Sequence, residues 1–256
     1  MPEPHKVIIT NDDGIEAPGL LALEAAFASA GSEVWVAAPA GERSTCSHGM
    51  TLGRPLSVAT AGPRRFAVDG TPADCIYWAL FCGSFPRPAV VASGINRGAN
   101  LGSDVIYSGT VAGAREAAIR GIHGVSSSLV EGDEYGPVAR AVAELALRLA
   151  LEPAAPVRLL NLNFPSGSFS AIRPGRLGRR IYPEVVETRP APGGGEPGHF
   201  LGGPPVEDGL EPGSDGWLVS RGFASATLLN LDQTDHAGMR IPGWAALLGF
   251  DNEGEP

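Results

Sequence analysis

Short apolar segments alternate with helical patterns along roughly the first 165 residues, and this alternation constrains the fold more than any other feature of the chain. The apolar segments are rich in β-branched residues, as buried strands are. The predicted strands cover residues 6–10, 33–38, 89–93, 124–130 and 157–164, with a short hairpin at 56–68, and the predicted helices begin near residues 18, 71, 108 and 135. This βαβα order predicts an α/β fold with a mostly parallel sheet and helices on both faces.

Two adjacent carboxylates follow the first predicted strand. Asp12 and Asp13 stand where the apolar run ends, and Gly14 comes next. In open α/β sheets, ligands bind outside the carboxyl ends of the strands. At about 4 Å and an effective dielectric constant of about 20, roughly 4 kcal/mol opposes ionisation of both groups, which a divalent cation would offset. Oxygen ligands suit Mg²⁺, Mn²⁺ or Ca²⁺, although Asp-Asp-Gly is equally good chemistry for a solvated turn.

Two later loops should reach the same edge of the sheet, because each follows a predicted parallel strand. The loop at 40–51 carries Ser44, a candidate oxygen ligand or phosphate contact, or else an ordinary hydrogen-bonding loop serine. The loop at 94–104 carries Asn96, whose carbonyl oxygen suits a cation, and Asn100, which suits a phosphate or a base. Its three glycines allow positive φ and a close approach of the backbone to a ligand. The alternative is a flexible surface loop.

A helix rich in Ala and Gly is predicted to begin beside these loops. Ser108 or Thr110 would cap it. Exposed N–H groups at a helix N-terminus bind anions, so the backbone of Gly109 and Thr110 is a candidate phosphate contact. Small residues also let a helix pack close to a sheet, so they have a structural explanation even where the cap is functional.

Composition narrows the classes of protein. The 256 residues suit a single α/β domain, and the formal net charge of -9 disfavours a general nucleic-acid-binding role. The three cysteines show no disulfide framework and no CxxC pair, so we expect a reduced, cytoplasmic compartment. The N-terminal residues lack the apolar core of a signal peptide, and no apolar run approaches the roughly 18 residues that span a bilayer. His48, His123 and His199 have no evident partners, so no zinc site is expected.

Composition changes after Pro165. Residues 166–216 are crowded with Gly, Pro and Arg, and we expect an excursion of hairpins or loops, an arm within one domain that spans 1–256. Residues 217–231 resume a strand-like pattern. Asp232 and His236 follow at a spacing of four residues, which fits a general acid–base pair or, more commonly, a structural ion pair.

Five separated motifs resemble those of the SurE family, the survival-protein 5′-nucleotidases, which are metal-dependent phosphatases acting on nucleoside monophosphates. The motifs occur in the family's order: TNDDGIEAPG at 10–19, AP at 38–39 with ERS at 42–44, GTPADC at 70–75, SGINRGANLG at 93–102 and VIYSGTVA at 105–112. A single motif is a weak indication, but five dispersed blocks in order are highly specific. In the last third the match thins: GSD at 213–215 resembles the family's Gly-Thr-Asp, TL at 227–228 stands in place of Thr-Pro, and the arm at 182–205 departs from the usual pattern.

The resemblance implies a three-layer α/β/α, Rossmann-like fold. It implies one divalent cation per subunit, Mg²⁺ or Mn²⁺, bound by Asp12, Asp13, Ser44 and Asn96. It also implies homodimers or homotetramers with swapped C-terminal segments, and a nucleoside monophosphate as the substrate in place of a nucleic acid polymer or a membrane.

The expected substrate contacts are polar or backbone groups beside these ligands: Asn11, Asn100, Ser108, Gly109 and Thr110. Asp12 and Asp13 are the candidate catalytic residues. Two routes fit them, in which either a cation-bound water attacks the phosphoryl group or Asp12 attacks directly and forms an aspartyl-phosphate. A non-catalytic nucleotide or metal sensor would be expected to have lost a ligand. A nicotinamide-dependent enzyme would carry G-x-G-x-x-G after the first strand, where this chain has Asn-Asp-Asp-Gly.

Overall fold

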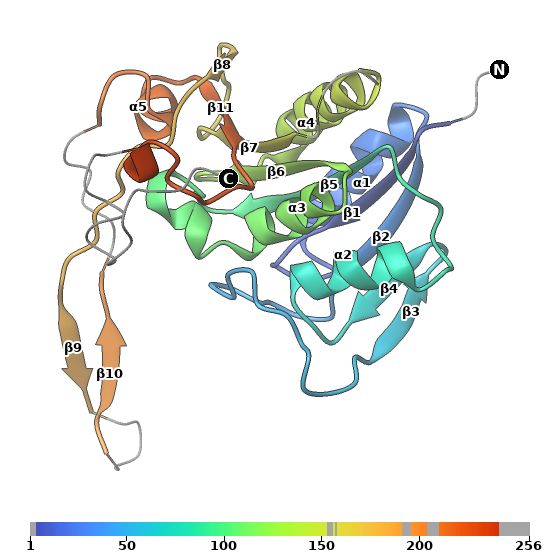
Figure 1. The fold of residues 1–256 in the computed structure, drawn as a ribbon, viewed down its shortest axis with the longest axis horizontal. Helices are drawn as coiled ribbons and strands as arrows, with labels where there is room; N and C mark the ends of the chain where they lie inside the picture. The colour runs from blue at the N-terminus through green and yellow to red at the C-terminus, as the bar shows by residue number, and fades with distance from the viewer. Residues whose placement is uncertain (1–3, 153–155, 157, 191–195, 204–209, 241–256) are drawn as a thin grey trace, which may run out of the picture.

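The chain folds around one large β-sheet (Figure 1), in a computed structural model that describes residues 4–152, 156, 158–190, 196–203 and 210–240. Strands and helices alternate in the first two thirds, as predicted. The elements there are β1 (Lys6–Thr10), α1 (Pro18–Ser29), β2 (Glu33–Pro39), β3 (Val58–Gly62), β4 (Arg65–Val68), α2 (Pro72–Phe81), β5 (Val90–Arg97), the 3-10 turn η1 (Gly102–Ile106), α3 (Gly109–Ile119), β6 (His123–Leu129), α4 (Tyr135–Ala150) and β7 (Leu159–Phe164).

The remaining elements follow β7. They are β8 (Ile172–Pro174), β9 (Val186–Arg189), β10 (Gly198–Leu201), α5 (Asp215–Ser220), β11 (Ala224–Leu229) and the 3-10 turn η2 (Gly238–Arg240). In the described residues the main sheet has nine strands, in the order β3-β4-β2-β1-β5-β6-β7-β11-β8. The strands from β4 through β7 run parallel to their neighbours, whereas β3 is antiparallel to β4 and β11 is antiparallel to β7.

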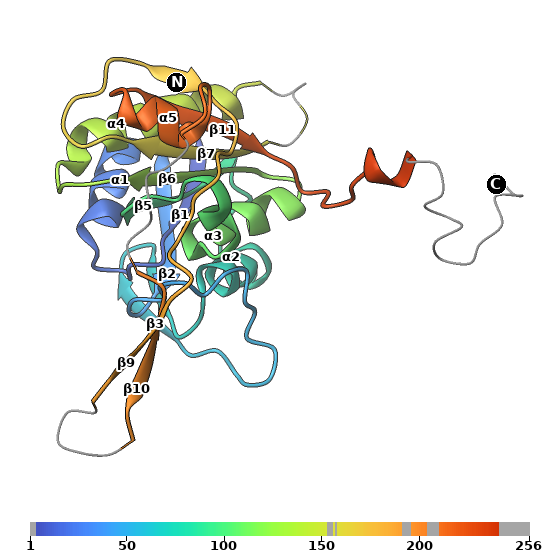
Figure 2. The ribbon, with the colours of Figure 1, turned by 90° about the vertical axis from the view of Figure 1, so that its left-hand side faces the viewer.

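Helices cover both faces of this sheet, so the predicted fold class is confirmed. The apolar sides of α1 and α4 meet one face and those of α2 and α3 meet the other (Figures 1 and 2). The largest fully buried side chains on the first face include Leu23 and Phe27 of α1 and Phe164 of β7. Burial of such side chains stabilises the fold by about 1.5–3 kcal/mol each.

Helix α3 lies very close to the sheet because its facing residues are small. A Cβ atom on Gly113 would lie 2.8 Å from Cγ2 of Thr10 and 3.0 Å from Oγ of Ser93. A Cβ on Gly124 of β6 would lie 2.0 Å from the carbonyl oxygen of Ala114. No larger residue fits at either position without a shift, and the N-terminus of α3 is thereby held beside the end of β1.

A row of buried polar residues crosses five strands beneath α3. The row is continuous in register: Thr10 of β1, Ser93 of β5, Ser126 of β6, Asn161 of β7 and Thr227 of β11 are successive partners. Each is at most 3% exposed. Within this row Ser126 donates a hydrogen bond to Asn161. The hydroxyls of Thr10, Ser93 and Thr227 have no hydrogen-bond partner among the described residues, although buried polar groups usually have one.

Two boundaries differ from the sequence-based expectations. Strand β5 continues to Arg97, with an irregularity in its pairing with β6 between Ser93 and Asn96, although we expected a loop from residue 94 onward. The expected strand from residue 217 is wrong at its start, because the segment is first the helix α5. Ser214 caps that helix by accepting a hydrogen bond from the N–H of Trp217, and the strand β11 begins only at Ala224.

The expected arm at 166–216 contains a two-stranded hairpin. Strands β9 and β10 pair antiparallel and extend away from the main sheet (Figure 1). The segment after β11, which carries η2, also leaves the body of the molecule (Figure 2). Within the described ranges, no helix is long and apolar enough to span a membrane.

Candidate functional site

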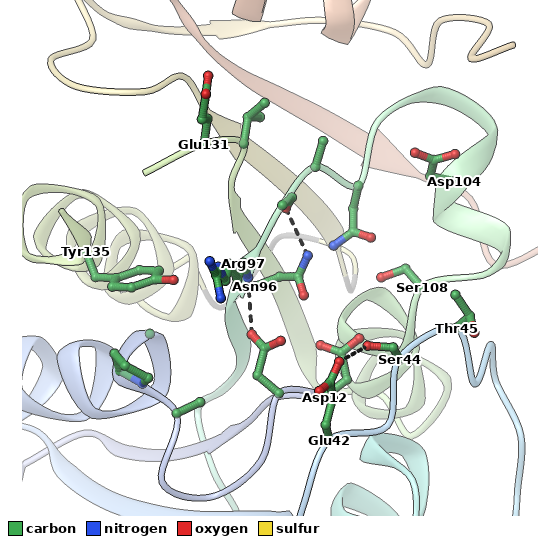
Figure 3. Close-up of a pocket in the computed structure, with 18 of the residues that line it drawn as sticks. Asp12, Glu42, Ser44, Thr45, Asn96, Arg97, Asp104, Ser108, Glu131 and Tyr135 are labelled. Carbon is green, nitrogen blue, oxygen red and sulfur yellow. Dashed lines mark hydrogen bonds between the residues drawn. The ribbon is translucent and has the colours of Figure 1, made fainter. Parts of the chain in front are cut away.

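An open cleft of about 1480 Å³ lies where the parallel strands β1, β2, β5 and β6 end. Its walls come from the loops that follow those strands, from the segment 104–108 and from Tyr182 near the base of the arm. The cleft brings together most of the residues that the sequence singled out: Asp12, Asp13, Ser44, Asn96, Asn100 and Ser108 all line it (Figure 3).

Asp12 is 7% exposed and is held from α3. Its Oδ1 accepts a hydrogen bond from the hydroxyl of Thr110 at 2.5 Å. Burial raises the pKa of Asp12 from 3.8 to about 6, the Thr110 hydroxyl opposes this rise, and the neighbouring Asp13 adds to it. Gly109 lets the helix approach, because a Cβ there would lie 3.0 Å from Cβ and Oδ2 of Asp12. In the metal-free protein Asp12 therefore resists ionisation.

Asp13 is half-buried and is held from β5. Its Oδ2 accepts a hydrogen bond from the backbone N–H of Arg97 at 3.1 Å. Burial raises the pKa of Asp13; the Arg97 N–H lowers it, and the Glu42 carboxylate raises it further. Both members of the pair thus have raised pKa values, as expected where a compensating positive charge belongs.

Ser44 belongs to a loop that is fixed from several sides. Its hydroxyl donates to Oε1 of Glu42 at 2.6 Å, and the N–H of the intervening Arg43 donates to the carbonyl of Asp12 at 2.7 Å. Further along, Thr51 donates two hydrogen bonds to the carboxylate of Asp74, at 2.8 and 2.6 Å. The loop is therefore tied both to the Asp12 turn and to the first turn of α2.

Asn96 completes the set of oxygen donors. Its Nδ2 donates to the carbonyl of Gly98 at 2.9 Å, which turns its Oδ1 away from that contact. Figure 3 shows Asp12, Ser44 and Asn96 converging on one region of the cleft. In the described part of the chain there is no cluster of three or more His, Cys, Asp or Glu side chains arranged for a metal. Any cation here would rely on two carboxylates together with neutral oxygens, a donor set that suits a hard ion.

The remaining predicted contacts lie beside the cleft or below it. Ser108 is the N-cap of α3 and accepts a hydrogen bond from the N–H of Val111 at 3.1 Å. The alternative cap, Thr110, instead points its hydroxyl at Asp12. Asn11 is fully buried and donates to the carbonyl of Gly14 at 2.8 Å, so its amide shapes the Asp-Asp turn. The described lining includes Ser108, but not Asn11, Gly109 or Thr110.

Several lining residues were not predicted. Carboxylates dominate the charge of the cleft, and among the described lining residues Arg97 is the only Lys or Arg. The lining carboxylates are Asp12, Asp13, Glu42, Asp104, Glu131 and Asp133. No sequence pattern linked Glu42, Asp104, Glu131 and Asp133 to the Asp12–Asp13 pair, since the six carboxylates come from four separate segments.

The base of the arm closes one side of the cleft. Tyr182 donates its hydroxyl to the carboxylate of Asp104 at 2.9 Å, and Arg180 lies 3.0 Å from the same group. Burial raises the pKa of Asp104, while the Tyr182 hydroxyl and Arg180 lower it. Tyr107, 61% exposed, and Tyr182, 40% exposed, both line the cleft. The sequence did not predict that Tyr182 and Arg180 contribute to the cleft, because the arm departs from the family's pattern.

His48 has a partner that the sequence did not reveal, whereas the pair formed by Asp232 and His236 was anticipated from their spacing. His48 lies 3.0 Å from the buried carboxylate of Glu116, which also pairs with Arg120 at 2.8 Å. Burial would raise the pKa of Glu116, but hydrogen bonds from His48 and Arg120 lower it overall. Asp232 and His236 form an exposed pair at 2.5 Å and do not line the cleft, which fits the structural alternative.

Comparison with known proteins matches this arrangement to a family. The family model described as "Survival protein SurE" matches residues 7–184. The 5′-nucleotidase SurE of Anaeromyxobacter sp. (strain Fw109-5) is 45% identical, covering 93% of this chain and 97% of its own. That of Sorangium cellulosum (strain So ce56) is 44% identical over 88% and 90%. The crystal structure of the SurE protein from Aquifex aeolicus superposes with a TM-score of 0.81 at 32% identity, covering 94% of this chain and 99% of that one.

The fold and the cleft define an α/β protein with a paired-aspartate site at the carboxyl edge of its sheet. The chain belongs to the SurE family. The resemblance found in its five motifs is thus confirmed.

Proposed function

We propose that this chain is a divalent-metal-dependent phosphatase that hydrolyses nucleoside monophosphates to nucleoside and phosphate. The observation that carries the proposal is the pair Asp12–Asp13 in a cleft whose described lining holds six carboxylates and one arginine. A phosphate dianion would be repelled by such a lining unless a cation intervened. The name 5′-nucleotidase SurE, given to relatives that are 42–45% identical over most of this chain, supports the same class of reaction.

The donor groups fit Mg²⁺ or Mn²⁺. The carboxylates of Asp12 and Asp13 would bind one ion, with neutral oxygens from Ser44 and Asn96. When bound, the ion would polarise the phosphoryl oxygens and supply a reactive water. The chain's own contribution is to fix these oxygens before binding: Thr110 holds Asp12, and the Arg97 N–H holds Asp13.

The substrate would lie along the cleft. Asn100 and the capped N-terminus of α3 at Ser108 would receive the phosphate, since free N–H groups at a helix start favour anions. Tyr107 and Tyr182 line the same cleft, and their rings would pack against the nucleoside.

The nucleophile is either water or Asp12. Asp12 is nearly buried and its Oδ1 is already engaged by Thr110, which favours a ligand role and attack by water. A covalent phosphoenzyme trapped by acid quench during turnover, and absent in Asp12→Asn, would overturn the water route.

The test is phosphate release from a panel of nucleoside monophosphates with Mg²⁺ or Mn²⁺, repeated with EDTA and with Asp12→Asn. Release that requires metal and Asp12 supports the proposal. Metal binding without release from any nucleotide would instead favour a nucleotide or metal sensor on the same fold. Release that survives both EDTA and Asp12→Asn would contradict the site.

We also propose that the chain assembles into homodimers or homotetramers with swapped C-terminal segments, in which the hairpin β9–β10 contributes to the interface. The hairpin carries Val186, Phe200 and Leu201, which are 60%, 49% and 83% exposed. Exposed apolar side chains on an extended element are typical of a contact surface. Light scattering should show that Leu201→Asp lowers the assembly mass, whereas Leu52→Asp, at an 87% exposed loop position, leaves it unchanged.

A further inference from the structure

The main chain of Asn100 is held by amide side chains of strand β7. Oδ1 of Asn163 accepts from the N–H of Asn100 at 2.8 Å, and Nδ2 of Asn163 donates to the Asn100 carbonyl at 3.0 Å. Nδ2 of Asn161 donates to the same carbonyl at 2.8 Å. Both β7 side chains are fully buried. A single primary amide thus satisfies both backbone groups of Asn100, as a neighbouring strand would.

The side chain of Asn100 is oriented separately. Its Nδ2 donates to Oγ of Ser128 at 2.8 Å. Asn161 is in turn fixed by the hydroxyl of Ser126, which donates to its Oδ1 at 2.9 Å. Each hydrogen bond in this set joins a donor to an acceptor in a buried setting, where such contacts restrict the geometry of the groups they join.

The loop around Asn100 depends on these contacts because it has left the sheet. Strand β5 ends at Arg97, and the N–H of Gly102 is held by another side chain, Oδ2 of Asp215, at 2.8 Å. Between them, Asn100 is only 6% exposed and yet lines the cleft. Side chains from β6 and β7 therefore set where its carboxamide stands.

We propose that Asn163, Asn161 and Ser128 are positioning residues that fix Asn100 for contact with the phosphoryl group. This inference rests on the proposed phosphatase function and deepens it. None of the three residues lines the described cleft, so any effect they have on the substrate must be indirect. They act through Asn100, and their substitution should therefore mimic a weakened Asn100 and leave cation binding unchanged.

Asparagine is the residue that suits position 163. An aspartate could still accept from the Asn100 N–H, but it would place a carboxylate against the Asn100 carbonyl and lose the donor. A leucine of similar size would leave the Asn100 N–H without its partner in a buried setting and would leave the Asn100 carbonyl with Asn161 alone. Ser128→Ala is gentler, because it removes only the acceptor that orients the Asn100 carboxamide.

The experiment compares Asn100→Ala, Ser128→Ala, Asn163→Asp and the double variant Asn100→Ala/Ser128→Ala. Ser127→Ala is the matched control, since it is the adjacent buried serine and its Oγ reaches Ser93 O at 3.4 Å, not Asn100. For each variant, kcat and KM are measured with a nucleoside monophosphate, together with inhibition by inorganic phosphate and calorimetric binding of Mn²⁺.

Ser128→Ala should raise KM and the inhibition constant of inorganic phosphate together, by about three- to tenfold, the usual effect of one lost hydrogen bond. Mn²⁺ affinity should not change, and the double variant should match Asn100→Ala, because a residue that acts through Asn100 has nothing to add without it. If Asn163→Asp folds, it should raise KM and the inhibition constant of phosphate by a larger factor, again with unchanged Mn²⁺ affinity. If it does not fold, the result for Ser128→Ala tests the inference by itself.

Additive losses in the double variant, or an equal loss in Ser127→Ala, would overturn the inference while leaving the proposed function intact. An Asn100→Ala variant with unchanged KM and phosphate inhibition would overturn it too, because Asn100 would then not contact the phosphoryl group. A wild-type protein that binds Mn²⁺ but releases no phosphate would instead count against the proposed function itself.

Discussion

The hydroxyl of Thr110 donates a 2.5 Å hydrogen bond to Oδ1 of Asp12, which lies 98 positions earlier in the chain. Both residues are buried, and the contact joins the first turn of α3 to the end of β1. The bond lowers the pKa of Asp12 against a larger rise caused by burial. Helix α3 therefore influences the proposed metal site through a side chain as well as through its N-terminus.

Thr110→Val should weaken cation binding near neutral pH. Valine keeps the shape of threonine but removes the donor, so the pKa of Asp12 should rise above about 6, by about one unit or more for a hydrogen bond to a charged group. Calorimetric Mn²⁺ titrations between pH 5 and 8 should show the half-binding pH moving upward. Thr110→Ser retains the hydroxyl and should follow the wild type. Superimposable profiles for valine and serine would contradict this role.

Asp12→Asn should stabilise the metal-free protein at high pH. The pKa of Asp12 is raised from 3.8 to about 6 in the folded state, so its contribution to stability is fully present below about pH 4 and is lost as the pH rises through 6. The loss is of the order of 3 kcal/mol. Urea unfolding with EDTA should show the variant gaining on the wild type between pH 5 and pH 8. A constant difference across that range would show that Asp12 is not buried as described.

Neutralising the cleft rim should favour more highly charged substrates. Glu131 and Asp133 line the cleft and are exposed, so their repulsion is screened and modest. Glu131→Gln with Asp133→Asn should raise kcat/KM for short polyphosphates by about two- to fivefold at low salt, relative to nucleoside monophosphates. The gain should disappear at high salt. Glu152→Gln, outside the cleft, is the control, and an equal gain there would point to net charge alone.

Tyr182→Ala should weaken nucleotide binding without affecting small phosphate esters. Loss of an aromatic contact typically corresponds to about three- to tenfold in affinity. KM should rise for nucleoside monophosphates and stay unchanged for ribose 5-phosphate, which lacks a base. Tyr182→Phe keeps the ring and separates stacking from the hydrogen bond to Asp104. Tyr77→Ala, an exposed tyrosine of α2 outside the cleft, controls for a general effect. Equal losses on both substrates would remove Tyr182 from base recognition.

Much of the fold followed from the sequence because its elements have strong local patterns. Thr71, Pro72 and Asp74 predicted the start of α2, and the structure shows the capping box they form, with hydrogen bonds of 3.1 and 2.9 Å. The candidate ligands Asp12, Ser44 and Asn96 could be grouped because parallel strands deliver their loops to one edge. Grouping these ligands requires only the direction of the strands, which the βαβ order of the elements predicts.

Most of the remaining features depend on contacts that local patterns do not encode, and one was a local helix cap that the apolar pattern outweighed. The segment 217–220 is apolar enough for a strand, but the cap at Ser214 makes it helical. Asn161 and Asn163 interrupt an apolar strand. Their role is evident only from their hydrogen bonds to the backbone of Asn100, about sixty positions earlier. Tyr182 reaches the cleft from an arm whose sequence gives no periodicity. For Asn161, Asn163 and Tyr182 the deciding partner is distant in sequence.

The arm that leaves the molecule at β9 also supplies part of the cleft wall. Arg180 and Tyr182 contact Asp104, and only three residues separate Tyr182 from the start of the hairpin. So short a connection allows little independent movement, so a displacement of the hairpin should be transmitted to Tyr182. If the proposed assembly forms through the hairpin, its contacts would also act on the proposed nucleoside end of the cleft, and substrate affinity should then rise or fall with protein concentration.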